Sequence, residues 1–291
     1  MDGIIVINKP KGMTSHDVVY KVKKMLNIKK VGHTGTLDPN ATGVLPLLLD
    51  NGTKLSKYLI EHDKEYEVCL QLGIKTDTLD SEGKVVKKEL VNDVLLSSSN
   101  VTSVFNSFIG KQFQVPPMYS AIKVKGKKLY ELARKGEKIE VEPREITIYD
   151  IKVNLIDMKN NEIFFTVKCS KGTYIRSLCN DIAVKLQTCG YMKELNRKQV
   201  GTFNIKEAIT LEELEENKDN KEYLKEKIIG IEDFFKDNGE IVLDNKKLEL
   251  FLNGVKINSE NSDGLYNIYN KGKYIGIGKV YKNQLKREIV I

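Results

Sequence analysis

The chain has 291 residues, of which 41% are hydrophobic and 30% charged, and its formal net charge is +7. These values are typical of an ordinary globular protein with a sizeable core, and the longest apolar run, 44–49, is too short to span a bilayer. The first residues lack the basic flank of a signal peptide, so we expect a cytoplasmic protein with no membrane association. The mild positive charge is compatible with an anionic partner such as nucleic acid, but does not single one out.

The spacing of apolar residues predicts a mixed chain of helices and strands. Ser15 is expected to cap a helix whose apolar positions run from Val18 to Leu26, and a glycine-rich loop at 32–43 follows it. Two further helices are expected, within 92–109 and at 173–187. Strands are predicted by apolar runs or by alternation at 3–8, 44–49, 64–72, 145–157 and 161–169. This order predicts an α+β fold with a mixed, largely antiparallel sheet.

The last fifty residues differ in pattern from the rest. Short β-rich runs alternate there with Asn, Gly and Lys turns, which predicts a small β-barrel. We expect one large domain at 1–235 and a small β-rich domain at 236–291. The acidic stretch at 206–240 is expected to be a helical connector.

Charge is distributed unevenly along the chain. Residues 111–144 carry nine Lys or Arg and four Glu, and residues 1–30 carry seven Lys and two Asp. Residues 210–240 instead carry eleven acidic and five basic residues. A solvated face explains any one such cluster, but together they predict a polarised molecule that holds an anionic ligand on one side.

No metal site is expected. The four cysteines form no C-x-x-C pair, and the three histidines lack ligand spacing. The apolar surroundings of the cysteines predict buried free thiols. The cysteines are Cys69, Cys169, Cys179 and Cys189.

The loop at 32–43 is the strongest candidate for chemistry. Its glycines permit backbone geometries closed to other residues, and Pro39 disfavours helical geometry at Asp38. A carboxylate on such a stiffened loop suits a nucleophile or a general base. On these residues alone, an Asp that closes a turn before Pro is the better explanation.

Five blocks of sequence, taken together, resemble one enzyme family. The segment Gly-His-Thr-Gly-Thr-Leu-Asp-Pro-Asn-Ala-Thr-Gly-Val-Leu-Pro at 32–46 is similar to the signature of bacterial tRNA pseudouridine-55 synthases of the TruB type. The blocks at 8–15, 64–68 and 170–178 resemble that family's N-terminal, tyrosine and arginine motifs. The block at 117–130 resembles its inserted thumb loop, which we place at about 114–144. The resemblance is close over about 3–205 and weak beyond, where it implies a PUA-like RNA-binding barrel.

The resemblance implies roles for three catalytic residues. Asp38 would attack the target uridine, leaving open whether the base or the sugar carbon is attacked. Arg176 would pair with Asp38 and keep its carboxylate ionised and oriented. Tyr66 would stack on the flipped base. Because Asp38 is used for the covalent step and the matched motifs offer no spare carboxylate or histidine, we further expect Tyr66 to transfer a proton, with stacking alone as the alternative role. No cofactor is implied, since the reaction is an isomerisation.

Other positions would bind the RNA. His33 would fill the gap that the flipped base leaves in the stack. Tyr174 and Leu195 match positions that line the family's pocket, and Lys9 and Lys11 would support the active-site loop without being catalytic. In the thumb, basic and aromatic residues are interleaved as RNA-binding loops require. The thumb candidates are Met118, Tyr119 and Lys123.

The implied function is conversion of uridine 55 in the tRNA T-loop to pseudouridine. The implied partner is the T-arm of tRNA, with a monomer that needs no obligate protein partner. Two alternatives stay open: a tRNA-folding chaperone on the same scaffold, and a guide-RNA-dependent pseudouridine synthase. The missing His/Cys signature excludes a zinc nucleobase deaminase.

Overall fold

The structure is a computed structural model that describes residues 1–59, 62–120, 122–124, 126–134, 136 and 139–291. Within this part, no helix is both long enough and apolar enough to cross a membrane. The first half of the chain contains β1 (Gly3–Lys9), α1 (Ser15–Met25), β2 (Val31–His33), β3 (Thr42–Leu49), η1 (Asp50–Leu55), α2 (Ser56–Leu59), β4 (Lys64–Leu72), β5 (Ile74–Thr76), β6 (Val85–Lys88), α3 (Ser98–Asn106), β7 (Gly110–Gln114), β8 (Lys123–Val124), β9 (Lys127–Lys128) and α4 (Leu129–Arg134).

A long sheet organises the main part of the molecule. Its strands lie in the order β14-β1-β3-β12-β4-β11-β10-β7, with β2 joined to β3 and β13 to β12. Within it only the short β12–β3 contact is parallel, so the mixed, largely antiparallel α+β sheet predicted from the sequence is confirmed. The remaining elements of this part are β10 (Arg144–Asp157), β11 (Glu162–Cys169), α5 (Ile175–Lys185), β12 (Gly190–Val200), β13 (Phe203–Asn204), α6 (Leu211–Asn217), α7 (Lys221–Lys227), β14 (Ile228–Gly230) and α8 (Ile231–Phe234).

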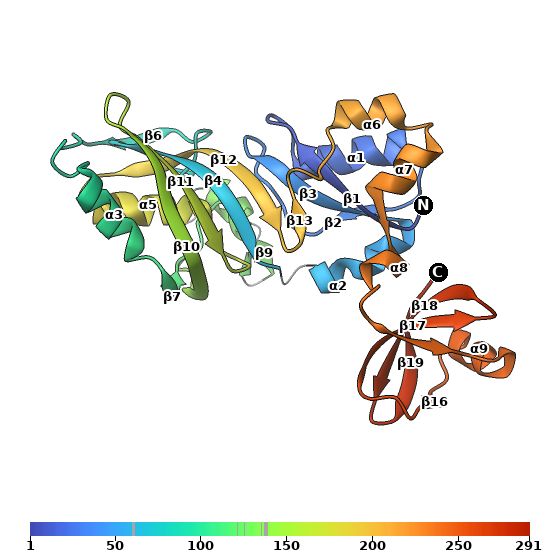
Figure 1. Cartoon of the computed structure of the whole chain (residues 1–291). Helices are drawn as coiled ribbons and strands as arrows, with labels where there is room; N and C mark the ends of the chain where they lie inside the picture. The colour runs from blue at the N-terminus through green and yellow to red at the C-terminus, as the bar shows by residue number, and fades with distance from the viewer. Residues whose placement is uncertain (60–61, 121, 125, 135, 137–138) are drawn as a thin grey trace.

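The period-two pattern of the strands buries both faces of the sheet. On β1, Ile5 and Ile7 pack against α1 and α6, while Ile4 and Val6 pack on the opposite side with α2 and α8. At the other end of the sheet, β4, β10, β11 and β12 share a core with α3 and α5. Figure 1 shows these two packed regions side by side along the sheet. β12 lies between them, so residues on β12 face both β3 and β4.

The C-terminal residues form a second sheet, drawn in red below α8 in Figure 1. Its order is β15-β17-β18-β19-β16, and Ile277 and Ile289 pack it against Phe235. The strands predicted from the Asn, Gly and Lys turns are present, and in the described chain the two edge strands do not pair with each other. The elements are β15 (Gly239–Val242), α9 (Asn245–Leu252), β16 (Ile257–Asn258), β17 (Gly264–Asn270), β18 (Lys273–Tyr281) and β19 (Gln284–Val290).

Three local predictions need correction or completion. The cap of α1 is Thr14 and not Ser15, because the Thr14 side chain accepts from the Asp17 amide while Ser15 is buried inside the helix. The acidic segment is not wholly helical, because Ile228–Gly230 returns to the sheet as β14 and pairs with β1. α9 interrupts the C-terminal strands, capped by Asp244. The prediction of four buried free cysteines is confirmed.

Candidate active site

The loop that carries Asp38 is fastened to the N-terminal turn. Lys9 is fully buried, and its ammonium donates to the carbonyls of Pro10, Met13 and Pro39. The buried Ser15 hydroxyl both donates to the Leu37 carbonyl and accepts from the Leu37 amide. Because these bonds occupy the backbone on both sides of Asp38, the carboxylate is held on a fixed support. Lys9 therefore supports the loop, as expected, while the side chain of Lys11 is exposed.

Arg176 connects Asp38 to a second carboxylate. Its Nε lies 3.2 Å from Oδ2 of Asp38, and its Nη1 lies 3.2 Å from Oδ2 of Asp80. The same guanidinium donates to the carbonyls of Thr78 and Tyr119, at 3.3 and 2.9 Å. The arginine lies in the first turn of α5, where the positive end of the helix dipole favours anions. Its two carboxylate partners therefore compensate both the guanidinium charge and the positive end of the helix. The fork thus connects the Asp38 loop, a turn after β5 and the base of the thumb through one residue.

Asp80 is itself held in place by its own turn. Its Oδ1 accepts from the Thr78 hydroxyl at 2.5 Å and from the Glu82 amide at 3.0 Å. Its backbone carbonyl accepts from the Thr76 hydroxyl. A carboxylate that accepts two hydrogen bonds, in a turn held by a third, can orient the guanidinium that in turn orients Asp38.

The groups around Asp38 have opposing effects on the pKa of its carboxyl. Burial raises the pKa of its carboxyl above the usual range and Asp80 adds to that rise, while Arg176 and Lys9 act to lower the pKa. The side chain still has about a third of its surface open. A partly desolvated carboxylate with one face open is poorly solvated by water, which favours its reaction as a nucleophile.

Tyr66 and Arg197 lie opposite each other on β4 and β12. Arg197 is 1% exposed, and it donates through Nε to the Val44 carbonyl at 2.8 Å and through Nη2 to the Gly35 carbonyl at 3.0 Å. Burial raises the pKa of the Tyr66 phenol to about 12, while the nearby Arg197 charge acts to lower it. In the resting site the tyrosine is therefore neutral at physiological pH, and Arg197 is the nearby cation that favours its ionisation.

Gly43 lets β12 approach β3 at this point. Its φ of +107° is unfavourable for other residues, and a Cβ there would lie 2.2 Å from the Arg197 carbonyl oxygen. A glycine is thus required where the backbone of Arg197 crosses the end of the Asp38 loop. This close contact fixes the strand from which the Arg197 side chain starts.

These residues surround one cavity of about 580 Å³. The Asp38 loop forms one wall, β4 and β12 a second, and the start of α5 with the base of the thumb the third. Six of the residues singled out from the sequence line it: Asp38, Tyr66, Tyr119, Tyr174, Arg176 and Leu195. In the described residues, no three His, Cys, Asp or Glu side chains are grouped as a metal site needs.

Three other candidates lie elsewhere. His33 is on β2 outside the cavity lining; its Nδ1 is buried without a hydrogen-bond partner, and burial lowers its pKa. Met118 is half-buried at the base of the thumb and is also absent from the lining. The side chain of Lys123 lies outside the part of the chain that the structure describes.

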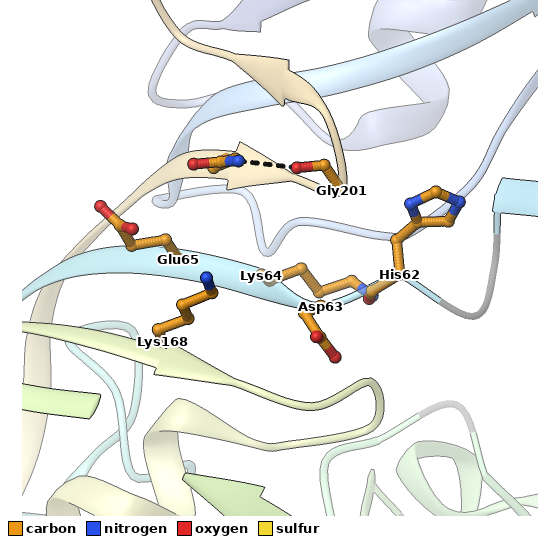
Figure 2. Close-up of a pocket in the computed structure, with 7 residues that line it drawn as sticks. His62, Asp63, Lys64, Glu65, Lys168 and Gly201 are labelled. Carbon is orange, nitrogen blue, oxygen red and sulfur yellow. Dashed lines mark hydrogen bonds between the residues drawn. The ribbon is translucent and has the colours of Figure 1, made fainter. Parts of the chain in front are cut away.

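A second, smaller hollow adjoins the first. It has a volume of about 360 Å³ and shares Lys64 with the main cavity. Figure 2 shows its lining, with the His62 ring near Gly201 and charged side chains from β4 and β11. Neither Asp38 nor Arg176 lines this hollow, so its chemistry is that of a polar surface groove beside the active cavity.

Sequence reasoning missed Asp80 and Arg197. Asp80 belongs to a polar turn, Thr-Asp-Thr-Leu-Asp-Ser-Glu-Gly at 76–83, whose residues by themselves predict only a turn. Arg197 follows Leu195 by two positions on a strand and so shares its face, which is a usable signal. Its partners Gly35 and Val44 are more than 150 residues away in sequence, and local patterns do not reveal them.

Comparison with known proteins adds family information to this geometry. A model of the TruB family pseudouridylate synthase N-terminal domain matches residues 23–175. A model of the tRNA pseudouridylate synthase B C-terminal domain matches residues 176–236. The two matches meet between Ile175 and Arg176, and together they include every residue of the cavity described above.

Curated relatives match over almost the whole chain. The chain is 44% identical to the tRNA pseudouridine synthase B of Clostridium tetani, over 98% of both chains. It is 47% identical to that of Clostridium kluyveri, over 96% of this chain and 95% of the relative. Among solved structures, a Cbf5-Nop10-Gar1 complex matches with a TM-score of 0.68 and 26% identity, covering 99% of this chain and 83% of that chain.

Proposed function

The chain belongs to the TruB family of pseudouridylate synthases, and from this premise we propose that it converts uridine 55 in the T-loop of tRNA to pseudouridine with Asp38 as the nucleophile. The observation that carries the proposal is the contact between Asp38 and Arg176 inside one cavity with Tyr66. The named relatives act on tRNA by their names, and tRNA is therefore the proposed substrate here. The proposal places the enzyme in the cytoplasm, where bacterial tRNA is used.

The reaction moves the ribose from one ring atom of uracil to another. The bond between N1 and C1′ breaks, a bond between C5 and C1′ forms, and the proton on C5 is lost while N1 gains one. In this chain Asp38 supplies the covalent step, and the Arg176 fork holds its carboxylate ionised and aimed at the cavity. The overall change is an isomerisation, so the oxidation state of the substrate is unchanged.

The cavity suits a single flipped nucleotide. A base in a folded loop must leave its stack before Asp38 can reach it. Tyr66 and Tyr174 line the cavity and offer aromatic surface to the extruded ring, and Leu195 adds an apolar contact. The thumb, whose base is tied to Arg176 through the Tyr119 carbonyl, is proposed to grip the T-arm beside this opening.

The stand-alone enzyme is favoured over the two alternatives. A chaperone would not need the contact between Asp38 and Arg176 or the second carboxylate of Asp80, and both are present. A guide-RNA-dependent enzyme is less favoured because relatives of nearly equal length are named as tRNA enzymes. We propose that the protein acts as a monomer, since one chain supplies every residue of the cavity. The small domain at 236–291 is proposed to bind RNA.

The direct test is incubation of the purified protein with tRNA transcript labelled with tritium at C5 of uracil. The parent enzyme should release tritium with multiple turnovers. Asp38→Asn should bind tRNA within about threefold of the parent, since the isosteric amide keeps the cavity shape, and release none. Multiple turnover by Asp38→Asn would exclude Asp38 as the nucleophile.

A further inference from the structure

Arg197 is a buried cation that, among the described residues, has no carboxylate partner. Its guanidinium donates to the carbonyls of Val44 and Gly35, and its side chain is 1% exposed. Burying a charge is expensive unless something compensates it. The Tyr66 phenol is the ionisable group whose charge and hydrogen bond favour the Arg197 cation and raise its pKa against the effect of burial. A neutral hydrogen-bonding residue could hold two carbonyls, so the charge itself needs a reason.

The geometry brings this charge and the Tyr66 side chain together from neighbouring strands. Arg197 and Tyr66 are directly opposed on β12 and β4, which brings their Cβ atoms to about 5 Å in an antiparallel pair. Both side chains reach the lining of the same cavity as Asp38. The close packing of the Arg197 backbone on Gly43 fixes where the side chain begins, and its two carbonyl bonds fix where it ends.

We propose that Arg197 is a positioning residue whose guanidinium stabilises the phenolate of Tyr66, so that Tyr66 can take the C5 proton of the target uracil. This inference rests on the proposed pseudouridine synthesis. Tyr66 releases its own proton to solvent through the cavity and becomes the phenolate. After the C5–C1′ bond has formed, the phenolate oxygen takes the proton from C5 and the C–H electron pair restores the ring double bond. N1 gains a proton from water, so no net proton is consumed.

The neighbouring groups show why a counter-charge is needed. Burial opposes ionisation of Tyr66, and the carboxyl of Asp38 opposes it further, so both raise the pKa of the phenol. Arg176, the other guanidinium of the cavity, is engaged by Asp38 and Asp80. One arginine thus serves the nucleophile and the other serves the tyrosine.

A double-mutant cycle separates this role from a structural one. Arg197→Gln keeps hydrogen-bond donors but removes the charge, and it is made in the parent and in the Tyr66→Phe background. Single-turnover tritium release should fall at least about tenfold in the parent background, the equivalent of one pKa unit. In the Tyr66→Phe background the same change should cost less than about threefold, because the group that needs the charge is gone.

Two controls keep the result interpretable. Arg197→Lys restores the charge and should recover most of the rate lost in Arg197→Gln. Lys198→Gln changes the next residue of β12, which pairs with Glu67 and not with the cavity, and should leave the rate within about twofold. Thermal unfolding and tRNA affinity are measured for every variant, so a loss of fold is recognised. If Arg197→Gln does not fold, the cycle is run with Arg197→Met, which also removes the charge and keeps a long side chain.

The outcomes are distinct. Equal losses from Arg197→Gln in both backgrounds would overturn the inference and leave Arg197 as a support for the Gly35 loop. The inference is also overturned if Arg197→Lys is no faster than Arg197→Gln although both are folded. A parent enzyme that releases no tritium from tRNA would instead refute the proposed function, and this result is independent of Arg197.

Discussion

Replacing Arg176 by Lys tests the central contact of the site. The guanidinium serves four acceptors from different parts of the chain: the carboxylates of Asp38 and Asp80 and the carbonyls of Thr78 and Tyr119. It reaches them through three nitrogens in a rigid plane. A lysine ammonium is a single point with three donors and cannot lie within hydrogen-bond distance of acceptors arranged around a fork. Arg176→Lys therefore keeps the positive charge but cannot hydrogen-bond all four acceptors at once.

The expected loss can be worked from these contacts. At least two of the four acceptors lose their partner, and each buried acceptor left unpaired costs about 1–3 kcal/mol. We assign roughly 3 kcal/mol of this to misplacement of the Asp38 carboxylate in the transition state, which corresponds to about a hundredfold in rate. Binding of tRNA should change little, because Arg176 is 8% exposed and faces the loop.

Single-turnover tritium release at saturating enzyme measures the chemical step directly. Arg287→Lys is the matched control, since Arg287 on β19 donates to the carbonyl of Leu252 at the end of α9, away from the cavity. It should retain the parent rate. An Arg176→Lys enzyme that reacts within about threefold of the parent would refute the reasoning, since a rate loss that small corresponds to less than 1 kcal/mol.

The same geometry leads to three further predictions. Tyr66→Phe should bind tRNA almost normally yet lose at least about a hundredfold in single-turnover rate, as expected for loss of a general base. Tyr66→Leu should lose tRNA affinity as well, because it also removes the stacking ring. A Tyr66→Phe rate within about threefold of the parent would mean that Tyr66 acts only by stacking on the base. Because the pKa of Asp38 is raised, the rate should begin to fall at a higher pH than it would for an ordinary carboxyl. A raised carboxyl pKa also means that ionisation of Asp38 lowers the stability of the fold as pH rises, so Asp38→Asn should unfold at a higher temperature than the parent at neutral pH. A lower unfolding temperature of Asp38→Asn would contradict this. Neutralising the thumb lysines together should weaken tRNA binding and flatten the dependence of tRNA affinity on salt concentration. The control neutralises four lysines of the acidic segment and should change neither; these are Lys218, Lys221, Lys225 and Lys227. If the thumb variant and the parent show the same slope of log affinity against log salt, the thumb is not part of the binding surface. The thumb lysines are Lys123, Lys125, Lys127 and Lys128, of which Lys125 lies outside the described residues.

Local patterns in the sequence predicted the framework well, because apolar runs mark strands buried on both faces and alternation marks strands buried on one. The run at 64–72 coincides with β4, and the alternation at 145–157 and 161–169 with β10 and β11. The helix α9 was missed because eight residues with an Asp cap give a weak periodic signal among strand-like runs. β14 was missed for a related reason: three residues form a strand only because β1 offers them an edge.

The site residues that could be predicted from the sequence were those that belong to recognisable motifs. Asp38 and Arg176 were both identified by the resemblance of their motifs, because the Asp38 loop by itself predicts only a turn before Pro39. The pairing of Arg176 with Asp80 depends on a turn about a hundred residues earlier, and no residue near Asp80 indicates it. Ser15 shows the opposite error: its sequence position suits a helix cap, but the backbone of Leu37 uses its hydroxyl instead. Such tertiary bonds override local preference and are visible only in the fold.

The most direct test of the account is to map pseudouridine in total tRNA from cells that lack this gene and are complemented with either the parent or Asp38→Asn. The account predicts that pseudouridine at position 55 disappears without the gene, returns with the parent and stays absent with Asp38→Asn, while other pseudouridines are unchanged. Persistence of pseudouridine 55 without the gene, its return with Asp38→Asn, or loss at a different position would contradict the account.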